Sequence, residues 1–436
     1  MHNCSTTRSG AVLVVLSLLV WSISTYLHDP ATPVVMELWG LKYSDVVYGV
    51  FYQRFSPSAG KFWFNGEKFA AFIRGDAFCP IPYIDYHFEY PPLTGFTWAL
   101  STCIAFAVSR DLNTAARIHY YVQATFSLAF LLAYASTLNK LALKTRQKPL
   151  RAVFALITPT LILYLVYNWD IATISLALLG MLALTDQRYL EGGLLLGASF
   201  SAKLLTAGIA YYFFVKLAFI NRKFHHLFKY TLGFSLTGLL PLLLLYVIAP
   251  QGFFKFIEHH ATWYCENCIY MVFIQDIWSP LHRYLYPVFS GLYVAVLTKL
   301  LLARYEPRVE LDIRYAYAYT SALIVFNYVF SPQMLIVLLP LAVLALKGFL
   351  LLEYAIADLF NAALIVEFFA EMQRGGNPWI LGSSAQLMAL TRNILVLLLL
   401  LQITLILYGY KGACTRLYSF STLMCFTTPS STPTTA

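Results

Sequence analysis

The sequence predicts an all-α polytopic membrane protein, and three observations indicate this fold class. Residues of the hydrophobic class make up 59% of the 436-residue chain and charged residues only 12%, whereas about a quarter of the residues in a soluble protein are charged. The mean hydropathy is +0.65. Apolar segments of roughly the 20 residues that cross a bilayer core recur along the whole chain. They leave no room for a soluble domain, so we expect one membrane domain over residues 1–426.

The apolar segments predict about twelve crossings. The candidate spans fall at about 10–28, 94–109, 117–137, 151–168, 170–185, 192–218, 229–249, 284–303, 314–330, 332–346, 349–370 and 385–410. Arg8 precedes the first of them as it would in a signal peptide, but no small-residue cleavage pattern follows, so we interpret this segment as a span. The tail 427–436 is of low complexity and is predicted to be disordered.

The basic residues predict the orientation of the spans. They gather in short runs at 140–151, 222–229, 299–314, 347 and 411–416. Short basic loops are retained in the cytoplasm, so we expect the first loop (residues 29–93) and the second loop (250–283) on the external face of the plasma membrane. The net charge of +9 lies in these runs, and no basic segment is long enough for a nucleic-acid groove.

Two parts of the chain do not fit this topology as simple single crossings. If 94–109 and 117–137 both crossed fully, the 140–151 run would lie on the same side as the first loop, and the sequence leaves this conflict open. Segment 192–218 must cross twice to keep both flanks inside, which predicts a broken pair of helices with its break near Lys203. Such a break is tolerated only where the backbone lines a cavity. A lysine there either snorkels to the surface or pairs with an anion, and the break favours an anion.

The first loop is predicted to hold an interfacial amphipathic helix over 61–74, because Phe62, Phe69 and Phe72 recur at roughly helical spacing. Earlier in this loop, Asp45 is a candidate general base. A lone loop aspartate is usually solvated or caps a helix. A base, however, needs a carboxylate that is held in place and partly sheltered from water. The neighbouring aromatic residues that would shelter it are Trp39, Tyr43, Tyr48 and Tyr52.

Glu89-Tyr90-Pro91-Pro92 ends the first loop. Two prolines stiffen the backbone and push the residue before them to an extended conformation, so Glu89 is presented on a rigid segment. The same prolines also fit a plain helix start, but this does not explain why Asp85, Tyr86 and His87 cluster just before Glu89.

Two further polar motifs interrupt apolar sequence. Asn168-Trp169-Asp170 separates two predicted spans, and an ionisable residue at membrane level is a functional candidate. A tight turn with Trp169 at the membrane interface explains it equally well. Ser331-Pro332-Gln333 separates another pair of spans and also fits a simple hairpin.

The second loop carries His259, His260, Cys265, Cys268, His282 and Arg283. Paired histidines beside a Cys-x-x-Cys fit a zinc site. The second pair of ligands that such a site usually has is missing, so we predict no metal, although a metal ion stays an open alternative. A disulfide between Cys265 and Cys268, or plain packing, remains open. His282 and Arg283, at the start of a span, are well placed for a phosphate.

These motifs, in this order, resemble the integral-membrane glycosyltransferases of the GT-C fold. The Tyr43-Ser44-Asp45 and Glu89-Tyr90-Pro91-Pro92 motifs, Asn168-Trp169-Asp170, Lys203 in a broken segment and Ser331-Pro332-Gln333 are similar to glycosyltransferase family 87. That family includes polyprenol-phosphate-mannose-dependent mannosyltransferases of mycobacteria and archaeal relatives. The resemblance covers nearly the whole chain and implies a GT-C bundle.

The resemblance implies an inverting hexosyltransferase. It would move a sugar, such as mannose, from a polyprenyl- or dolichyl-phosphate carrier to a lipid-linked or glycan acceptor on the external face. Asp45 would be the general base, and the phosphate would meet Lys203, Arg283 and His282. The candidate substrate-binding residues are Tyr43, Tyr48, Asp85, Glu89, Tyr90, Asn168, Trp169, Asp170, His259, His260 and Gln333.

Two other classes of function remain. A secondary transporter or flippase would use Asp45, Asp170 and Lys203 as coupling or substrate-binding groups, but such proteins usually carry internal repeats, and we find none. A structural membrane protein would use the polar loops as interaction surfaces. The acids that precede Pro91 favour the enzyme over both alternatives.

Overall fold

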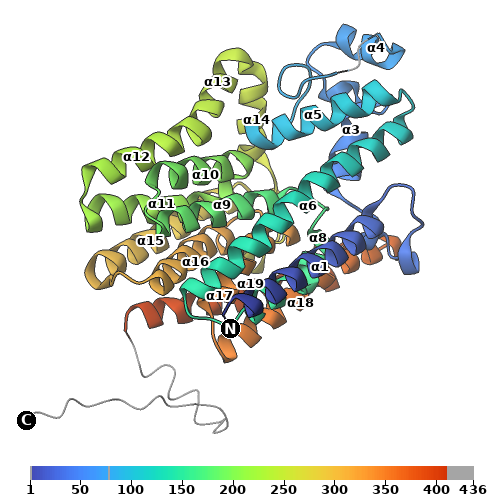
Figure 1. Cartoon of the computed structure of the whole chain (residues 1–436). Coiled ribbons are helices and arrows are strands. Elements are labelled where there is room, and N and C mark those ends of the chain that lie inside the picture. Colours follow the sequence, from blue (N-terminus) through green and yellow to red (C-terminus); the bar gives the residue numbers. More distant parts are fainter. Residues whose placement is uncertain (1, 77–78, 410–436) are drawn as a thin grey trace, which may run out of the picture.

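The computed structural model describes residues 2–76 and 79–409, and within them the protein is helical, with isolated β-bridges and no strand (Figure 1). Seven of its helices are long and apolar enough to cross a membrane. The chain is therefore an all-α integral membrane protein, which confirms the predicted fold class. The predicted disordered tail 427–436 and the basic run 411–416 lie outside the described residues.

The seven long helices are α1 (His2–His28, with its apolar part at Gly10–His28), the segments Leu204–Asn221 and Phe224–Ile248, α6 (Leu112–Lys144), α15 (Leu281–Arg304), α18 (Phe349–Gln373) and α19 (Ser384–Leu407). Three apolar helices are shorter: α5 (Pro92–Val108), α9 (Asp170–Thr185) and Pro332–Ala345, which contains α17 (Leu335–Ala345). The remaining helices are α2 (Trp39–Lys42), α3 (Tyr52–Phe55), α4 (Gly66–Arg74), α7 (Leu150–Leu156), α8 (Pro159–Tyr164), α10 (Tyr189–Ala202), α11 (Ala207–Val215), α12 (Phe224–Phe234), α13 (Leu240–Ile248), α14 (Pro250–Thr262) and α16 (Val309–Val325).

The number of full-length spans in the described residues is thus smaller than the predicted count, because several predicted spans are short or broken. The predicted span 151–168 is two short helices, α7 and α8, since Pro159 cannot donate a backbone hydrogen bond within a continuous helix. The predicted span 314–330 begins earlier, at Val309, and includes Glu310 and Asp312 in its first turn.

The predicted break at Lys203 is confirmed. Helix α10 ends at Ala202, Lys203 is extended (φ −157°, ψ 129°), and a 3-10 turn follows at Leu204 before α11. Ending α10 here leaves backbone carbonyl groups without helical partners. The Thr94 hydroxyl donates to the Ala202 carbonyl oxygen at 2.8 Å, so a side chain of α5 stabilises the break.

The amphipathic helix expected over 61–74 is shorter than predicted. Helix α4 begins at Gly66 because the Asn65 side chain caps it, accepting from the backbone N–H groups of Glu67 and Lys68 at 2.8 and 3.1 Å. The residues before Asn65 form a separate 3-10 turn, Ala59–Phe62. Phe72 is the buried residue of α4.

The structure resolves the conflict between the segments 94–109 and 117–137. Near the end of α5, Phe106 packs against Phe51, Phe55 and Phe72 of the first loop, with ring centroids 4.9–5.5 Å apart. The next helix starts close by, since the Tyr52 hydroxyl donates to Asn113 at 3.1 Å. Both ends of α5 therefore lie beside the first loop. Of these two helices, it is α6 that runs to the other end of the molecule, beside α17 (Figure 1).

Three of the basic runs, 140–151, 299–314 and Lys347, meet at that other end, which we call the basic end. Lys144 pairs with Asp186 at 2.6 Å, Lys347 with Glu310 at 2.8 Å, and Gln147 donates to the Leu344 carbonyl oxygen at 2.7 Å. At 1.5 Å per residue, the 33 residues of α6 span about 50 Å, which exceeds the roughly 30 Å of a bilayer core. The first loop and the basic end are thus separated by at least the thickness of a membrane.

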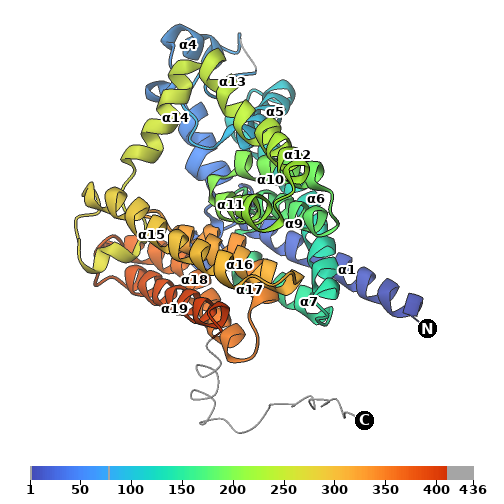
Figure 2. The ribbon, with the colours of Figure 1, turned by 90° about the vertical axis from the view of Figure 1, so that its left-hand side faces the viewer.

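The two loops pack against each other on the side away from the basic end. Helix α14 of the second loop lies beside the first loop (Figure 2). A side chain at Gly252 would collide with the Tyr83 backbone, so glycine permits this close approach. The His260 imidazole Nε2 lies 3.0 Å from the Glu89 carbonyl oxygen. The two loops therefore form one layer that covers this end of the bundle.

Candidate functional site

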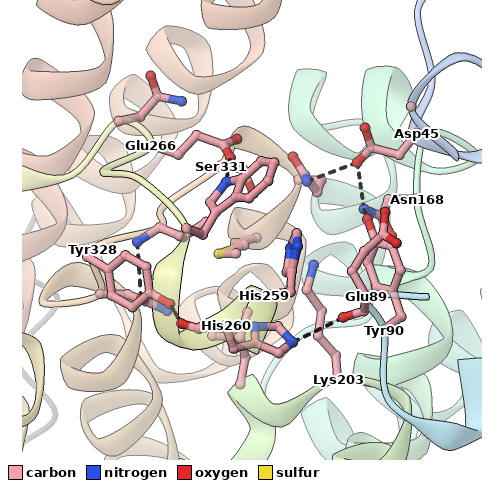
Figure 3. A pocket seen from close by; sticks show the side chains of 18 of the residues that line it. Asp45, Glu89, Tyr90, Asn168, Lys203, His259, His260, Glu266, Tyr328 and Ser331 are labelled. Carbon is pink, nitrogen blue, oxygen red and sulfur yellow. Dashed lines mark hydrogen bonds between the residues drawn. The ribbon is translucent and has the colours of Figure 1, made fainter. Parts of the chain in front are cut away.

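A cavity of about 1310 Å³ lies beneath this layer, where segments far apart in the sequence meet. Its wall combines the first loop, the turn at Asn168, the break at Lys203, the second loop and the turn at Ser331 (Figure 3). The predicted site residues that line it are Tyr43, Asp45, Glu89, Tyr90, Asn168, Lys203, His259, His260, Arg283 and Gln333. Most of the predicted site is thus brought together.

Asp45 is held at the wall of the cavity by two other segments, the turn at Asn168 and the turn at Ser331. Its backbone N–H donates to the Tyr167 carbonyl oxygen at 3.0 Å, and a π-helical turn runs from Asp45 to Phe51. Its carboxylate Oδ2 accepts from the Asn168 side-chain amide at 2.8 Å and from the Gln333 amide at 3.4 Å (Figure 3). These contacts fix the carboxylate without neutralising its charge.

The surroundings bring the pKa of the Asp45 carboxyl close to neutral pH. Burial and the nearby carboxyl of Glu266 raise its pKa to about 7, against the opposing effects of the Asn168 amide and the charge of Lys203. A general base works best when its pKa lies near the working pH. Asp45 can therefore both accept and release a proton near neutrality.

Asn168 connects Asp45 to Tyr90. The same amide nitrogen that binds Asp45 also donates to the Tyr90 hydroxyl at 3.1 Å, and the Asn168 side-chain oxygen Oδ1 accepts from the Trp169 backbone N–H at 2.6 Å. The Trp169 ring packs edge-to-face on Tyr90, with centroids 4.5 Å apart, and its indole N–H donates to Gln123 at 3.0 Å. Trp169 does not line the cavity but supports Tyr90 from behind.

Glu89 belongs to a second polar group in the cavity. Arg54 donates to the Glu89 carboxylate at 2.7 Å and to the His87 carbonyl oxygen at 2.8 Å. Burial alone would raise the pKa of Glu89, but Arg54, with smaller contributions from His259 and His87, holds that pKa below its usual value. Arg54 was not predicted, because nothing in the local sequence separates it from an ordinary surface arginine.

The histidines of this group are neutral hydrogen-bonding groups near neutral pH. Burial lowers the pKa of His259 to about 4 and also lowers the pKa values of His87 and His260. The His259 ring packs on Trp263, with centroids 4.5 Å apart. The Nε2 atom of His87 is buried and has no partner among the described residues. A ligand in the cavity can therefore find uncharged polar groups on this side.

The predicted anionic partner of Lys203 is supplied by the protein itself. The Lys203 ammonium lies 2.7 and 2.9 Å from the two carboxylate oxygens of Asp170. The Asp170 side chain is fully buried behind it, whereas that of Lys203 is 12% exposed and lines the cavity. Asp170 thus balances the charge of Lys203 and does not itself line the cavity.

Three other predicted residues lie outside the cavity. Tyr48 packs between Trp39 and Tyr52. Asp85 pairs with Lys68 at 2.7 Å and accepts from a backbone N–H of its own loop. His282 is buried, with its Nε2 2.9 Å from the Asp276 carbonyl oxygen. Their positions are those of structural residues.

Two disulfides join four of the described cysteines. The Cys265–Cys268 disulfide agrees with one alternative left open by the sequence, whereas Cys79–Cys103, 24 residues apart, was not expected. His282 lies beside the first pair, with Nδ1 3.7 Å from the Cys268 sulfur. Thiolates are the ligands that zinc prefers, and the disulfide consumes both. These residues in this state therefore do not fit a metal.

Glu266 lies between the two cysteines and faces the cavity, which the sequence did not reveal. Its backbone N–H donates to the Tyr328 carbonyl oxygen at 2.9 Å, and its carbonyl oxygen accepts from Phe330 at 2.8 Å. Burial raises the pKa of its carboxyl, while the Trp263 indole, which donates to it at 3.2 Å, opposes this effect. The cavity therefore contains a second carboxyl that titrates above its usual range.

No protein-family model matches this chain, and a search of the curated proteins finds no match. The resemblance to a family therefore rests on the sequence motifs alone.

We expect Lys203→Met to destabilise the protein, because it leaves the buried Asp170 carboxylate without its partner. The free energy of unfolding should fall by about 3–5 kcal/mol, measured by denaturant unfolding in detergent micelles. The double variant Lys203→Met, Asp170→Asn should recover most of this loss, since no charge is left unpaired. A single variant as stable as the parent protein would contradict the structural role of the pair.

Proposed function

We propose that the protein is a membrane glycosyltransferase that transfers a hexose from a polyprenyl-phosphate carrier to a hydroxyl acceptor. The observation that carries this proposal is the Asp45 carboxyl at the cavity wall, held by two amide donors and with a pKa near 7. A partly buried carboxyl poised in this way is typical of a general base.

The reaction needs one proton acceptor and one phosphate-binding group. The acceptor oxygen forms a bond to the anomeric carbon of the sugar, the bond from that carbon to the phosphate oxygen breaks, and the hydroxyl proton moves to Asp45. The polyprenyl phosphate departs with the bonding electron pair and gains one negative charge. Attack on the face opposite the leaving group inverts the anomeric centre. A cation that faces the leaving phosphate stabilises the developing charge.

Arg283 is the best-placed cation for that phosphate. The charges of Lys203 and Arg54 are each offset by a carboxylate, from Asp170 and Glu89. The Arg283 guanidinium instead donates to the carbonyl oxygens of Thr262 and Trp263 at 2.8 and 3.3 Å, and no carboxylate among the described residues pairs with it. Its charge remains available, and we assign Lys203 a secondary role in phosphate binding.

The rest of the cavity wall suits a lipid-linked sugar. Aromatic residues such as Tyr43, Tyr90 and Trp263 present faces on which a sugar ring can stack, and apolar residues such as Leu204 and Leu323 extend the wall for a prenyl chain. We propose that the bundle is of the GT-C type, with about twelve passes when short and broken helices are included. The gathering of basic runs at the opposite end supports an external position for the cavity.

Replacing Asp45 by Asn should remove the proton acceptor while keeping the side-chain shape. We expect transfer of sugar from a polyprenyl-phosphate hexose to fall by about 10²–10⁴-fold, with unchanged thermal unfolding. Asp76→Asn is the matched control, because Asp76 is an exposed acid of the same loop that pairs with Arg74. Full transfer activity in the Asp45 variant would refute its role as the base.

The rate of transfer should depend on the protonation of Asp45. Only the carboxylate accepts a proton, so the rate should rise with pH and reach half of its maximum near pH 7. In Glu266→Gln a nearby negative charge that raises the pKa of Asp45 is gone. The half-maximum should therefore move to lower pH in a pH–rate profile, and a shift in the opposite direction would contradict this coupling.

Gly49 has no side chain, and the Asp45 carboxylate occupies the space where one would lie. A Cβ at this position would lie 2.9 Å from Asp45 Oδ1 and 2.8 Å from the Tyr43 hydroxyl, so Gly49→Ala should displace the carboxylate. A shift of about 1 Å at a reacting group costs on the order of 10²-fold in rate. Gly291→Ala, where nothing lies within 4 Å, should leave transfer unchanged. Equal activity of the two variants would show that the Asp45 position is not critical.

A further inference from the structure

A second cavity, of about 570 Å³, lies at the basic end, far from the site described above. It is formed by the turn after α6, by α7 and by the beginning of α18. Four of its lining residues are basic, namely Arg146, Lys148, Arg151 and Lys347, and none of its lining residues is acidic. The cavity is therefore a concentrated positive site at one end of the bundle.

Two of these cations have no partner among the described residues. The Arg151 guanidinium donates to the carbonyl oxygens of Val343 and Leu346, both at 2.8 Å, and Lys347 pairs with Glu310. Arg146 and Lys148 are exposed, and their side chains make no ion pair or hydrogen bond within residues 2–76 and 79–409. An anion in this cavity would thus meet two uncompensated positive charges beside a fixed guanidinium.

The remaining wall of the cavity is apolar and faces outward. Leu150 is 67% exposed and Ile157 50% exposed, and Phe154 and Leu351 continue this surface. In a membrane-spanning bundle, such side chains next to a basic rim lie where the hydrocarbon core meets the headgroups. A water-soluble anion would make no use of this apolar wall.

We propose that this cavity binds an anionic phospholipid. Its phosphate would lie among Arg146, Lys148 and Arg151, and an acyl chain would follow Leu150, Phe154 and Ile157. The complementarity of charge and the adjoining apolar wall favour one molecule that carries both an anionic headgroup and a hydrocarbon chain. This inference is independent of the proposed catalytic function, because it rests on a different end of the molecule.

The proposal can be tested by native mass spectrometry of the purified full-length protein in detergent, with added dioleoyl phosphatidylglycerol or dioleoyl phosphatidylcholine. We expect a saturable adduct with phosphatidylglycerol and roughly tenfold weaker binding of phosphatidylcholine. Glycerol phosphate, which has the headgroup chemistry without the chains, should not compete. Equal binding of the two lipids, or displacement by glycerol phosphate at equal concentration, would overturn the proposal.

A pair of matched variants locates the binding. Arg146→Ala, Lys148→Ala removes two unpaired exposed cations and should weaken phosphatidylglycerol binding by about ten- to thirtyfold. Lys223→Ala, Lys229→Ala removes the same charge from exposed residues outside the cavity and should change binding less than twofold. If both variants lose binding equally, the lipid recognises net charge and not this cavity. Thermal unfolding of each variant confirms that the fold is retained.

Discussion

The hydrogen bond from Asn168 to Asp45 is the interaction on which the arrangement of the site depends. It joins the first loop to the turn between α8 and α9, over 123 positions of sequence. The same amide orients Tyr90, near the end of the first loop, and the Trp169 ring packs against the far side of Tyr90. In an apolar chain a buried carboxylate is costly unless polar groups solvate it. Asp45 therefore specifies how these segments pack as well as what they can do.

Charge compensation shapes the rest of the cavity. Two cations at its wall have an opposite partner: Lys203 has Asp170, and Arg54 has Glu89. Because each pair is neutral as a whole, these pairs attract a charged ligand only weakly. Arg283, whose donors bind only backbone carbonyl oxygens, and the carboxyls of Asp45 and Glu266, whose pKa values are raised, are the groups that can respond to a substrate. The chemistry of the site is thereby confined to these three groups, in a cavity whose other two charged pairs are neutral as pairs.

Features with a local cause could be predicted from the sequence. The break at Lys203 was predictable because a lysine and the length of the segment required it, and Pro91-Pro92 marked the start of α5. The pairing of Arg54 with Glu89 and the position of Glu266 could not be predicted, since both depend on how distant segments pack. The path of α5 likewise depends on its contacts with the first loop. The hydropathy of α5 does not indicate these contacts. Sequence therefore indicated the candidate groups, and tertiary structure selected among them.

Sugar transfer at the cavity is tested most directly by incubating the purified protein, in liposomes, with a panel of polyprenyl-phosphate hexoses and candidate acceptors. We expect one donor of the panel to release free polyprenyl phosphate in step with glycosylation of an acceptor, with inversion at the anomeric carbon. Movement of an intact lipid-linked sugar between leaflets without release of the carrier phosphate would contradict a transferase and indicate a flippase.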